Sequence, residues 1–530
     1  MLTRFMFRSF AAVAAIVLAV AAADARSLKW ARTADSLTLD PHAQNEGPTH
    51  NLMHQLYEPL LIRDAAGKVH PTLAVSWKVT ADPAVWEFKL RQGVKFHNGN
   101  AFTADDVVFS LKRAQQPTSD MKGLLTSIED VIKVDDHTVH VKTKGPNPLL
   151  PNNLTNLFMM DKEWSEEHNT ITVQDYKGKK DNYAVRNANG TGPYTLVSRQ
   201  QDVQTVLKRN EAYWGKGQVP LGISDITYVA VKADATRVAS LLSGEVDFVQ
   251  DVPVQDIERL QKSANLKVNF GPENRTIFFG MDVSSPELKT SNVKGKNPFA
   301  DKRVRQAINM SIDRDGIKRA VMRGQSVPAG VIAPPFVNGY SKALDALPKV
   351  DLAKAKALMK EAGYADGFQI TLHCPNDRYI NDEGICQASA AMLAKIGIKV
   401  NLVAQPRGPH FTLIQKTPPE TEFYMVGWGV PTYDSHYIFS FLYNTRSGSD
   451  GSWNATRYSN ADMDAAIRSL TSEIDIAKRN ATIQRVWNVV HGETIYIPLH
   501  HQMLAYGMKK GLDIPVSPDN TVFIKFVAAK

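Results

Sequence analysis

The chain has 530 residues, 43% hydrophobic and 22% charged, which excludes a disordered, collagen-like or coiled-coil protein and leaves room for two or three domains. The net charge of +8 is a mild excess for this length, and because five consecutive Lys or Arg residues never occur, a nucleic-acid-binding function is not indicated. Two cysteines are too few for a multi-cysteine zinc module or a disulfide-rich scaffold.

Residues 1–25 have the pattern of a signal peptide for export. Arg4 and Arg8 supply positive charge, and residues 10–23 form an apolar run shorter than the roughly 20 residues of a bilayer span. Residues 23–25 (ADA) have the small-x-small pattern of a cleavage site. We therefore expect a mature chain that begins at Arg26 and is periplasmic in a bacterium with two membranes. The alternative is an uncleaved N-terminal anchor helix.

The rest of the chain mixes short strands with helices. Apolar and polar residues alternate in 86–90 and 138–141, which predicts strands, whereas 351–362 carries an apolar stripe at helical spacing. Thr103, followed by the acids Asp105 and Asp106, predicts a capped helix start, and we interpret the acids as dipole partners, not as an acid–base pair. The pattern predicts an α/β fold.

Catalytic signatures are missing from the sequence. It contains no Gly-x-Ser-x-Gly elbow, no His-Glu-x-x-His and no phosphate-binding loop of the Walker type. His500 and His501 are adjacent, with His491 nearby, but neighbouring residues of a strand point to opposite faces. We therefore predict packed or cleft-lining histidines there and no metal site.

The two cysteines are 12 residues apart, Cys374 after a predicted strand at 368–372 and Cys386 at the start of a predicted helix that continues through 387–396. An oxidising compartment permits a disulfide between them. Such a bridge would close a strand-to-helix loop and stabilise the fold by roughly 2–4 kcal/mol. Two separate buried thiols are the alternative.

Short phrases in a fixed order along the mature chain resemble one family. They include residues 39–42 (LDPH), 57–60 (YEPL), 90–97 (LRQGVKFH), 102–110 (FTADDVVFS), 190–194 (GTGPY), 213–215 (YWG), 301–308 (DKRVRQAI), 427–428 (GW) and 497–499 (IPL). In this order and spacing, they resemble the dipeptide/oligopeptide-binding family of solute-binding proteins of ABC importers, which is family 5 of the bacterial extracellular solute-binding proteins.

The resemblance implies a type II periplasmic-binding-protein fold, with two large hinged lobes and an inserted third domain. It places lobe I at 26–60, 189–272 and 495–530, the inserted lobe II at 61–188, and lobe III at 273–494. The ligand is then expected between lobes I and III. The resemblance also implies a monomer without a cofactor, whose partners are a small peptide-like ligand and an inner-membrane ABC permease.

Arg378 is the first predicted ligand-binding residue. It lies between a strand and a helix, where α/β proteins place ligand-facing loops. In dipeptide-binding relatives an Arg in the corresponding loop holds the ligand carboxylate, and a planar guanidinium suits this task because it donates two charge-assisted hydrogen bonds. The alternative is a surface Arg paired with Asp377 or Asp382.

Trp428 is the second, because the glycines on both sides of it allow a close approach of ligand to backbone. Peptide-binding relatives carry an Asp about three residues later that pairs with the peptide amino group, but this chain has Pro431 there. Asp434 and Glu46 are therefore the candidate partners of a ligand cation, and a turn residue and a solvated loop acid are the respective alternatives. Asn45, which follows His42 in a loop expected to face the cleft, and His436 complete the predicted set.

The function expected from the resemblance is reversible capture of a solute and its delivery to a permease. Short peptides are the family default, but Pro431 leaves opines, other amino-acid conjugates, oligosaccharides and metal chelates open. The alternatives from other classes are an extracytoplasmic hydrolase of peptides or glycans, for which no nucleophile–base or carboxylate pair is visible, and a chaperone-like or sensory binding protein.

Overall fold

A computed structural model of the chain describes residues 26–64, 66–176, 178–448 and 450–528. The predicted signal peptide lies outside the described residues. Within the described ranges, no helix is long and apolar enough to cross a membrane.

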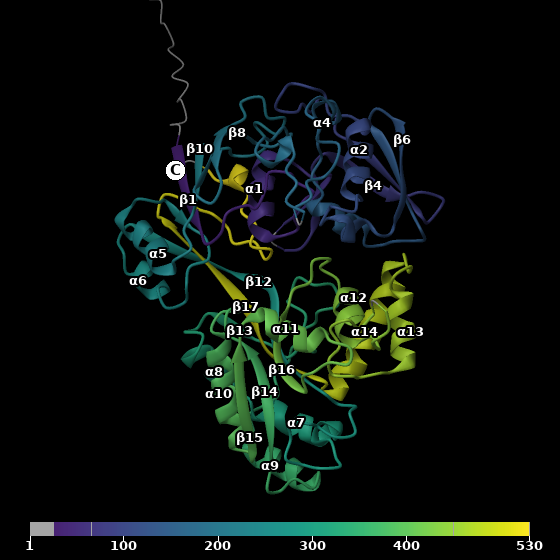
Figure 1. Cartoon of the computed structure of the whole chain (residues 1–530), viewed down its shortest axis with the longest axis vertical. Coiled ribbons are helices and arrows are strands. Elements are labelled where there is room, and N and C mark those ends of the chain that lie inside the picture. The colour runs from purple at the N-terminus through teal and green to yellow at the C-terminus, as the bar shows by residue number, and fades with distance from the viewer. Residues whose placement is uncertain (1–25, 65, 177, 449, 529–530) are drawn as a thin grey trace, which may run out of the picture.

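An 11-stranded mixed sheet runs through the described part of the chain and connects its two lobes (Figure 1). Its strand order is β15 (Ile398–Gln405), β14 (Phe368–Pro375), β16 (Phe423–Trp428), β12 (Leu266–Met281), β17 (Tyr496–Lys509), β11 (Phe248–Val249), β1 (Arg26–Arg32), β10 (Ile223–Ala230), β9 (Gln204–Arg209) and β8 (Tyr194–Gln200), and β13 (Ser326–Pro328) also pairs with β17. The long strands β12 and β17 pair antiparallel from Leu266↔Lys509 to Gly280↔Tyr496 and pass from one lobe to the other.

The upper lobe of Figure 1 holds hydrophobic clusters formed by residues up to Leu266 and from Leu504 onward. Its helices are α1 (Gly47–Leu56), α2 (Ala104–Ala114), α3 (Leu150–Asn153), α4 (Lys162–Glu167), α5 (Asp234–Ser243) and α6 (Ile257–Gln261). One cluster, between Leu60 and Met159, packs α2 on a separate four-stranded sheet of β4 (Ala74–Val79), β5 (Val85–Leu90), β7 (Thr138–Thr143) and β6 (Ile128–Asp135). The short pair β2 (Leu61–Arg63) and β3 (Val69–Pro71) adjoins it in sequence.

The lower lobe holds two hydrophobic clusters formed by residues between Ile277 and Leu499. Its helices are α7 (Lys302–Ser311), α8 (Arg314–Ala320), α9 (Leu352–Glu361), α10 (Asp382–Ala394), α11 (Arg407–Gln415), α12 (Ser435–Ile438), α13 (Ala461–Ser469) and α14 (Ile476–Glu493). The described residues thus form two lobes of mixed α/β structure, as predicted. The residue boundaries expected for the three lobes stay a prediction.

Local sequence signals explain several of these elements. Thr103 and Asp106 form a capping box at the start of α2, which satisfies backbone donors that the first turn leaves open. The strands predicted at 86–90 and 138–141 and the helix at 351–362 are present as β5, β7 and α9. One boundary differs from the prediction: α10 begins at Asp382, so Cys386 lies inside the helix and not at its start.

Candidate functional site

A cavity of about 690 Å³ lies between the two lobes. The upper lobe lines it with the start of α1, the end of β1 and the C-terminal segment around Asp519, and the lower lobe with the loop after β14, the end of β16 and residues of α11 and α12. The middle of β12, at 273–275, forms part of the wall where the chain passes between the lobes. A ligand in this cavity therefore contacts both lobes.

The structure places Arg378 in this cavity, in the loop between β14 and α10. The Asp382 carboxylate accepts the backbone N–H of Arg378 at 2.9 Å and of Tyr379 at 3.0 Å, and a Cys374–Cys386 disulfide joins β14 to α10. These contacts fix the loop from both ends.

The Arg378 guanidinium is half-buried and lies 5.2 Å from the Tyr379 ring, and no carboxylate of the described residues is within ion-pair distance of it. The two acids expected as alternative partners of Arg378 bind backbone N–H groups instead. Asp382 accepts that of Arg378 itself, and Asp377 accepts that of Arg407. Burial and then the positive charge of Arg275 lower the pKa of Arg378. An anionic ligand group beside Arg378 would favour the charged guanidinium and so compensate for its burial and for the repulsion from Arg275.

Trp428 also lines the cavity, at the end of β16, and is 7% exposed. The preceding glycine has a different role from the one predicted. A Cβ on Gly427 would lie 2.5 Å from the Ile277 side chain and 2.7 Å from the Tyr379 ring, so Gly427 is needed for packing within the lobe.

Three aromatic residues that the sequence did not single out join Trp428 in the cavity wall: Phe411 of α11, Tyr437 of α12 and Trp453. The ring centroids of Trp428 and Trp453 are 5.3 Å apart, as are those of Phe411 and Trp453, and those of Trp428 and Tyr437 are 5.8 Å apart. We call these four residues the aromatic wall. No pattern in the sequence reveals it, because its members come from separate segments.

On the upper side, Asn45 is exposed to the cavity, and Glu46 caps α1 by accepting the backbone N–H of Thr49 at 2.8 Å. Burial raises the pKa of Glu46, against hydrogen bonds from Thr49 that lower it. Within the described chain, no Lys, Arg or His side chain forms an ion pair with this carboxylate.

The other charged residues of the cavity are divided between paired and unpaired groups. Arg32 pairs with Asp251 at 3.2 Å, and Arg275 pairs with Glu273 at 2.9 Å. Asp519 accepts a hydrogen bond from Asn274 at 3.2 Å, and no cation of the described ranges lies within ion-pair distance of it. Burial raises the pKa of Asp519, although the charge of Arg63 nearby acts in the opposite direction. Arg378 on the lower lobe therefore faces the same cavity as two unpaired carboxylates, Glu46 and Asp519, on the upper lobe.

Two residues of the predicted set, Asp434 and His436, do not line this cavity. Asp434 is 3% exposed, caps α12, and accepts two hydrogen bonds from the Arg479 guanidinium at 2.5 and 2.7 Å. The carboxylate is thus neutralised inside the lobe, and the prediction that it meets a ligand cation is corrected. His436 contacts the Ser440 hydroxyl at 3.1 Å, and burial lowers its pKa to about 4.

The loop residue His42 was also expected to face the cleft, but it is fully buried inside the upper lobe. Its Nε2 lies 2.9 Å from the Phe158 carbonyl oxygen, and its Nδ1 lies 3.1 Å from Arg113. Of the adjacent histidines on β17, His501 contacts the Thr276 hydroxyl at 2.9 Å, and burial lowers the pKa of His500 to about 3. Neither of the two lines the interlobe cavity.

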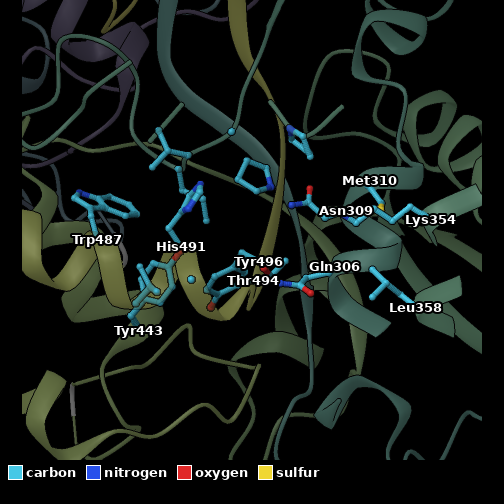
Figure 2. A pocket seen from close by; sticks show the side chains of 17 residues that line it. Gln306, Asn309, Met310, Lys354, Leu358, Tyr443, Trp487, His491, Thr494 and Tyr496 are labelled. Carbon is cyan, nitrogen blue, oxygen red and sulfur yellow. The ribbon is translucent and has the colours of Figure 1, made fainter. Parts of the chain in front are cut away.

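A second cavity, of about 410 Å³, lies within the lower lobe (Figure 2). Gln306 and Asn309 of α7, Lys354 of α9, Trp487 and His491 of α14, and Tyr496 of β17 line it. All of its lining residues belong to one lobe, so closure of the two lobes cannot enclose a ligand there. The interlobe cavity is the better candidate for the functional site.

Comparison with known proteins agrees with this geometry. A family model described as bacterial extracellular solute-binding proteins, family 5 middle, matches residues 68–450. The glutathione-binding protein GsiB of Salmonella typhimurium is 27% identical over 522 residues, or 96% of each chain, and that of Escherichia coli K12 is 26% identical over 506 residues, or 94% of each.

Solved structures show the same fold, which is that of the type II periplasmic binding proteins. HbpA2 from Haemophilus parasuis is 24% identical with a TM-score of 0.81, covering 95% of this chain and 100% of that one. The periplasmic binding protein DppA from Helicobacter pylori, solved with the peptide STSA, is 23% identical with a TM-score of 0.70, covering 95% of this chain and 98% of that one.

Proposed function

This chain belongs to family 5 of the bacterial extracellular solute-binding proteins and is the substrate-binding component of an ABC importer, and from this premise we propose that it captures a short peptide or peptide-like zwitterion between its lobes. One observation carries the proposal. Arg378 of the lower lobe and two carboxylates of the upper lobe, Glu46 and Asp519, line one cavity without ion-pair partners among the described residues.

The two ends of a peptide complement this arrangement of charges. A ligand carboxylate can accept two parallel hydrogen bonds from Arg378, and a ligand ammonium can donate to Glu46 or Asp519. Asp434, which the sequence offered for the second role, is occupied by Arg479. Glutathione, named in the GsiB relatives, and the peptide STSA, bound in the DppA structure, are solutes of this chemical class.

The mechanism is hinged closure of the lobes around the ligand. Ligand favours the closed state because only there does it contact both lobes, and a micromolar affinity needs a net free energy of only about −8 kcal/mol. The lobes also contact each other directly. The Arg63 guanidinium donates to the Pro431 carbonyl oxygen at 3.3 Å and lies 4.0 Å from the Tyr433 ring.

The closed protein then docks on a membrane permease and releases the solute unaltered. Binding and release require no cofactor and no chemical step, and the protein acts as a monomer. The proposal thus differs from an extracytoplasmic hydrolase, which would convert the peptide. The predicted signal peptide at residues 1–25 belongs to the proposal as the means of export.

Calorimetry with ligand-stripped protein tests both charge contacts. We compare Ala-Phe with its N-acetylated and its C-terminally amidated forms, and expect each blocked form to bind at least tenfold more weakly. Glu46→Gln and Asp519→Asn identify the carboxylate that binds the amine, because the variant at that position loses the preference for the free amine. Equal affinity for free and blocked peptides refutes zwitterion recognition, and cleavage of the peptide in the calorimeter cell, detected by mass spectrometry, refutes the carrier role.

Glu46 also gives the proposal a pH dependence. An ammonium partner requires the ionised carboxylate, so binding weakens as the pH falls through the pKa of Glu46. Because burial raises this pKa, the loss begins at a higher pH than for an exposed Glu. The Glu46→Gln variant should lack this part of the pH profile if Glu46 holds the amine.

A further inference from the structure

We propose that the cleft selects peptides whose carboxyl-terminal side chain is aromatic or large and apolar, and that the aromatic wall of Phe411, Trp428, Tyr437 and Trp453 is the subsite for that side chain. The inference rests on the proposed function, since it assumes that Arg378 binds the terminal carboxylate. It adds the chemical class of the ligand side chain next to that carboxylate.

The aromatic wall is a continuous apolar surface inside a cavity that is otherwise rich in charge. Its rings come from α11, the end of β16, α12 and the segment that contains Trp453, and they contact one another at centroid distances of 5.3–5.8 Å. Phe411, Tyr437 and Trp453 are only partly buried, so part of each side chain is still open to solvent. Covering apolar surface of this kind is favourable, and ring–ring contacts add to the gain.

The aromatic wall and Arg378 line the same cavity. The Tyr379 ring lies beside the Arg378 guanidinium, and the Tyr379 hydroxyl donates to the Gly427 carbonyl oxygen at 3.1 Å. Trp428 follows Gly427 directly. A ligand whose carboxylate binds Arg378 therefore occupies the cavity that the aromatic wall also lines, where its own apolar side chain can cover the rings.

The charges around the wall favour a neutral group over a cation. Aromatic rings can hold a quaternary ammonium, but among the described residues the only carboxylate that the lower lobe and the 273–275 stretch of β12 add to the cavity lining is Glu273, which is already paired with Arg275. Arg378 is unpaired, and the carboxylates without partners, Glu46 and Asp519, belong to the upper lobe. A ligand cation at the wall would therefore share the lower side of the cavity with the unpaired positive charge of Arg378, and the acid there, Glu273, is neutralised by Arg275.

The inference separates this protein from what the names of its relatives suggest. Glutathione ends in glycine, which has no side chain to cover the wall. We therefore expect glutathione to bind more weakly than a dipeptide that ends in Phe or Trp.

Calorimetry on the ligand-stripped full chain tests the inference with Ala-Ala, Ala-Phe, Ala-Trp, Ala-trimethyllysine and glutathione. We expect Ala-Phe and Ala-Trp to bind at least tenfold more tightly than Ala-Ala and glutathione. Trp453→Ala and Phe411→Ala should each weaken the binding of Ala-Phe more than that of Ala-Ala, and so remove most of this preference. The matched control is Phe526→Ala, an exposed ring outside the cavity, which should change neither affinity.

Equal affinity for Ala-Phe and Ala-Ala, or tightest binding of Ala-trimethyllysine, overturns the inference but leaves the proposed function in place. Binding of none of the five compounds overturns the proposed function itself. If an alanine variant does not fold, the milder Trp453→Phe replaces it. Tryptophan emission of the unaltered protein should then shift with Ala-Phe but not with Ala-Ala, and Trp453→Phe should reduce the shift; equal shifts with both peptides refute the inference.

Discussion

Replacing Arg378 by alanine is expected to remove most of the affinity for a free carboxylate. The guanidinium is half-buried in the interlobe cavity, and no acid of the described chain pairs with it, so its N–H groups are available to bind a ligand carboxylate. A hydrogen bond to a charged group contributes about 1.5–3 kcal/mol. Loss of at least one such bond raises the Kd for Ala-Phe about tenfold or more.

Calorimetry at neutral pH measures this change, and two further variants sharpen it. Arg378→Lys keeps the charge but loses the planar guanidinium, so its affinity for Ala-Phe should lie between that of the unaltered protein and that of Arg378→Ala. Arg303→Ala removes an exposed arginine of the same lobe that pairs with Asp301, and it should leave binding unchanged. Unchanged affinity in Arg378→Ala, with the amidated peptide bound as well as the free one, would refute the reasoning.

Three more predictions concern stability. Asp434→Asn leaves Arg479 buried without its carboxylate, so denaturant melts should show a loss of about 3–5 kcal/mol with unchanged affinity for Ala-Phe, and a binding defect at full stability would contradict this. Reducing the Cys374–Cys386 disulfide frees the loop that carries Arg378, so melts with reductant should show a loss of roughly 2–4 kcal/mol, and identical melts would contradict it. Burial lowers the pKa of several histidines from 6.5 to about 3 or 4, namely His42, His50, His54, His97, His410, His436 and His500. As the pH falls from 6.5 to 4, only the unfolded state therefore binds protons at these side chains, and the free energy of unfolding should decrease. Denaturant melts across this pH range measure the decrease, and a flat profile would contradict the prediction.

The sequence predicted the fold class and part of the cavity for identifiable reasons. Helix caps and period-two strands are local signals, and the ordered family phrases supplied the two-lobed architecture. Arg378 and Trp428 follow predicted strands, where loops face ligands, and the structure brings both into one cavity with Asn45 and Glu46. Their contacts with a ligand stay predictions.

What the sequence did not reveal depends on contacts between distant segments. Asp519 lies near the C-terminus and reaches the cavity because Asn274 of β12 donates its backbone N–H to the Pro518 carbonyl oxygen. The neutralisation of Asp434 by Arg479 joins residues 45 positions apart. Trp453 and Phe411 meet only through the packing of the lower lobe. None of these pairings leaves a periodic or motif signal in the chain.

The central claim is that the two lobes close reversibly around a zwitterionic solute and release it unchanged. Mass spectrometry of the intact complex, followed by that of the released solute, tests this directly. The account predicts one molecule per chain, carrying a free carboxylate and a free amine, with the same mass before binding and after release. Release of a cleaved product, or a bound solute that lacks both charged groups, would contradict it.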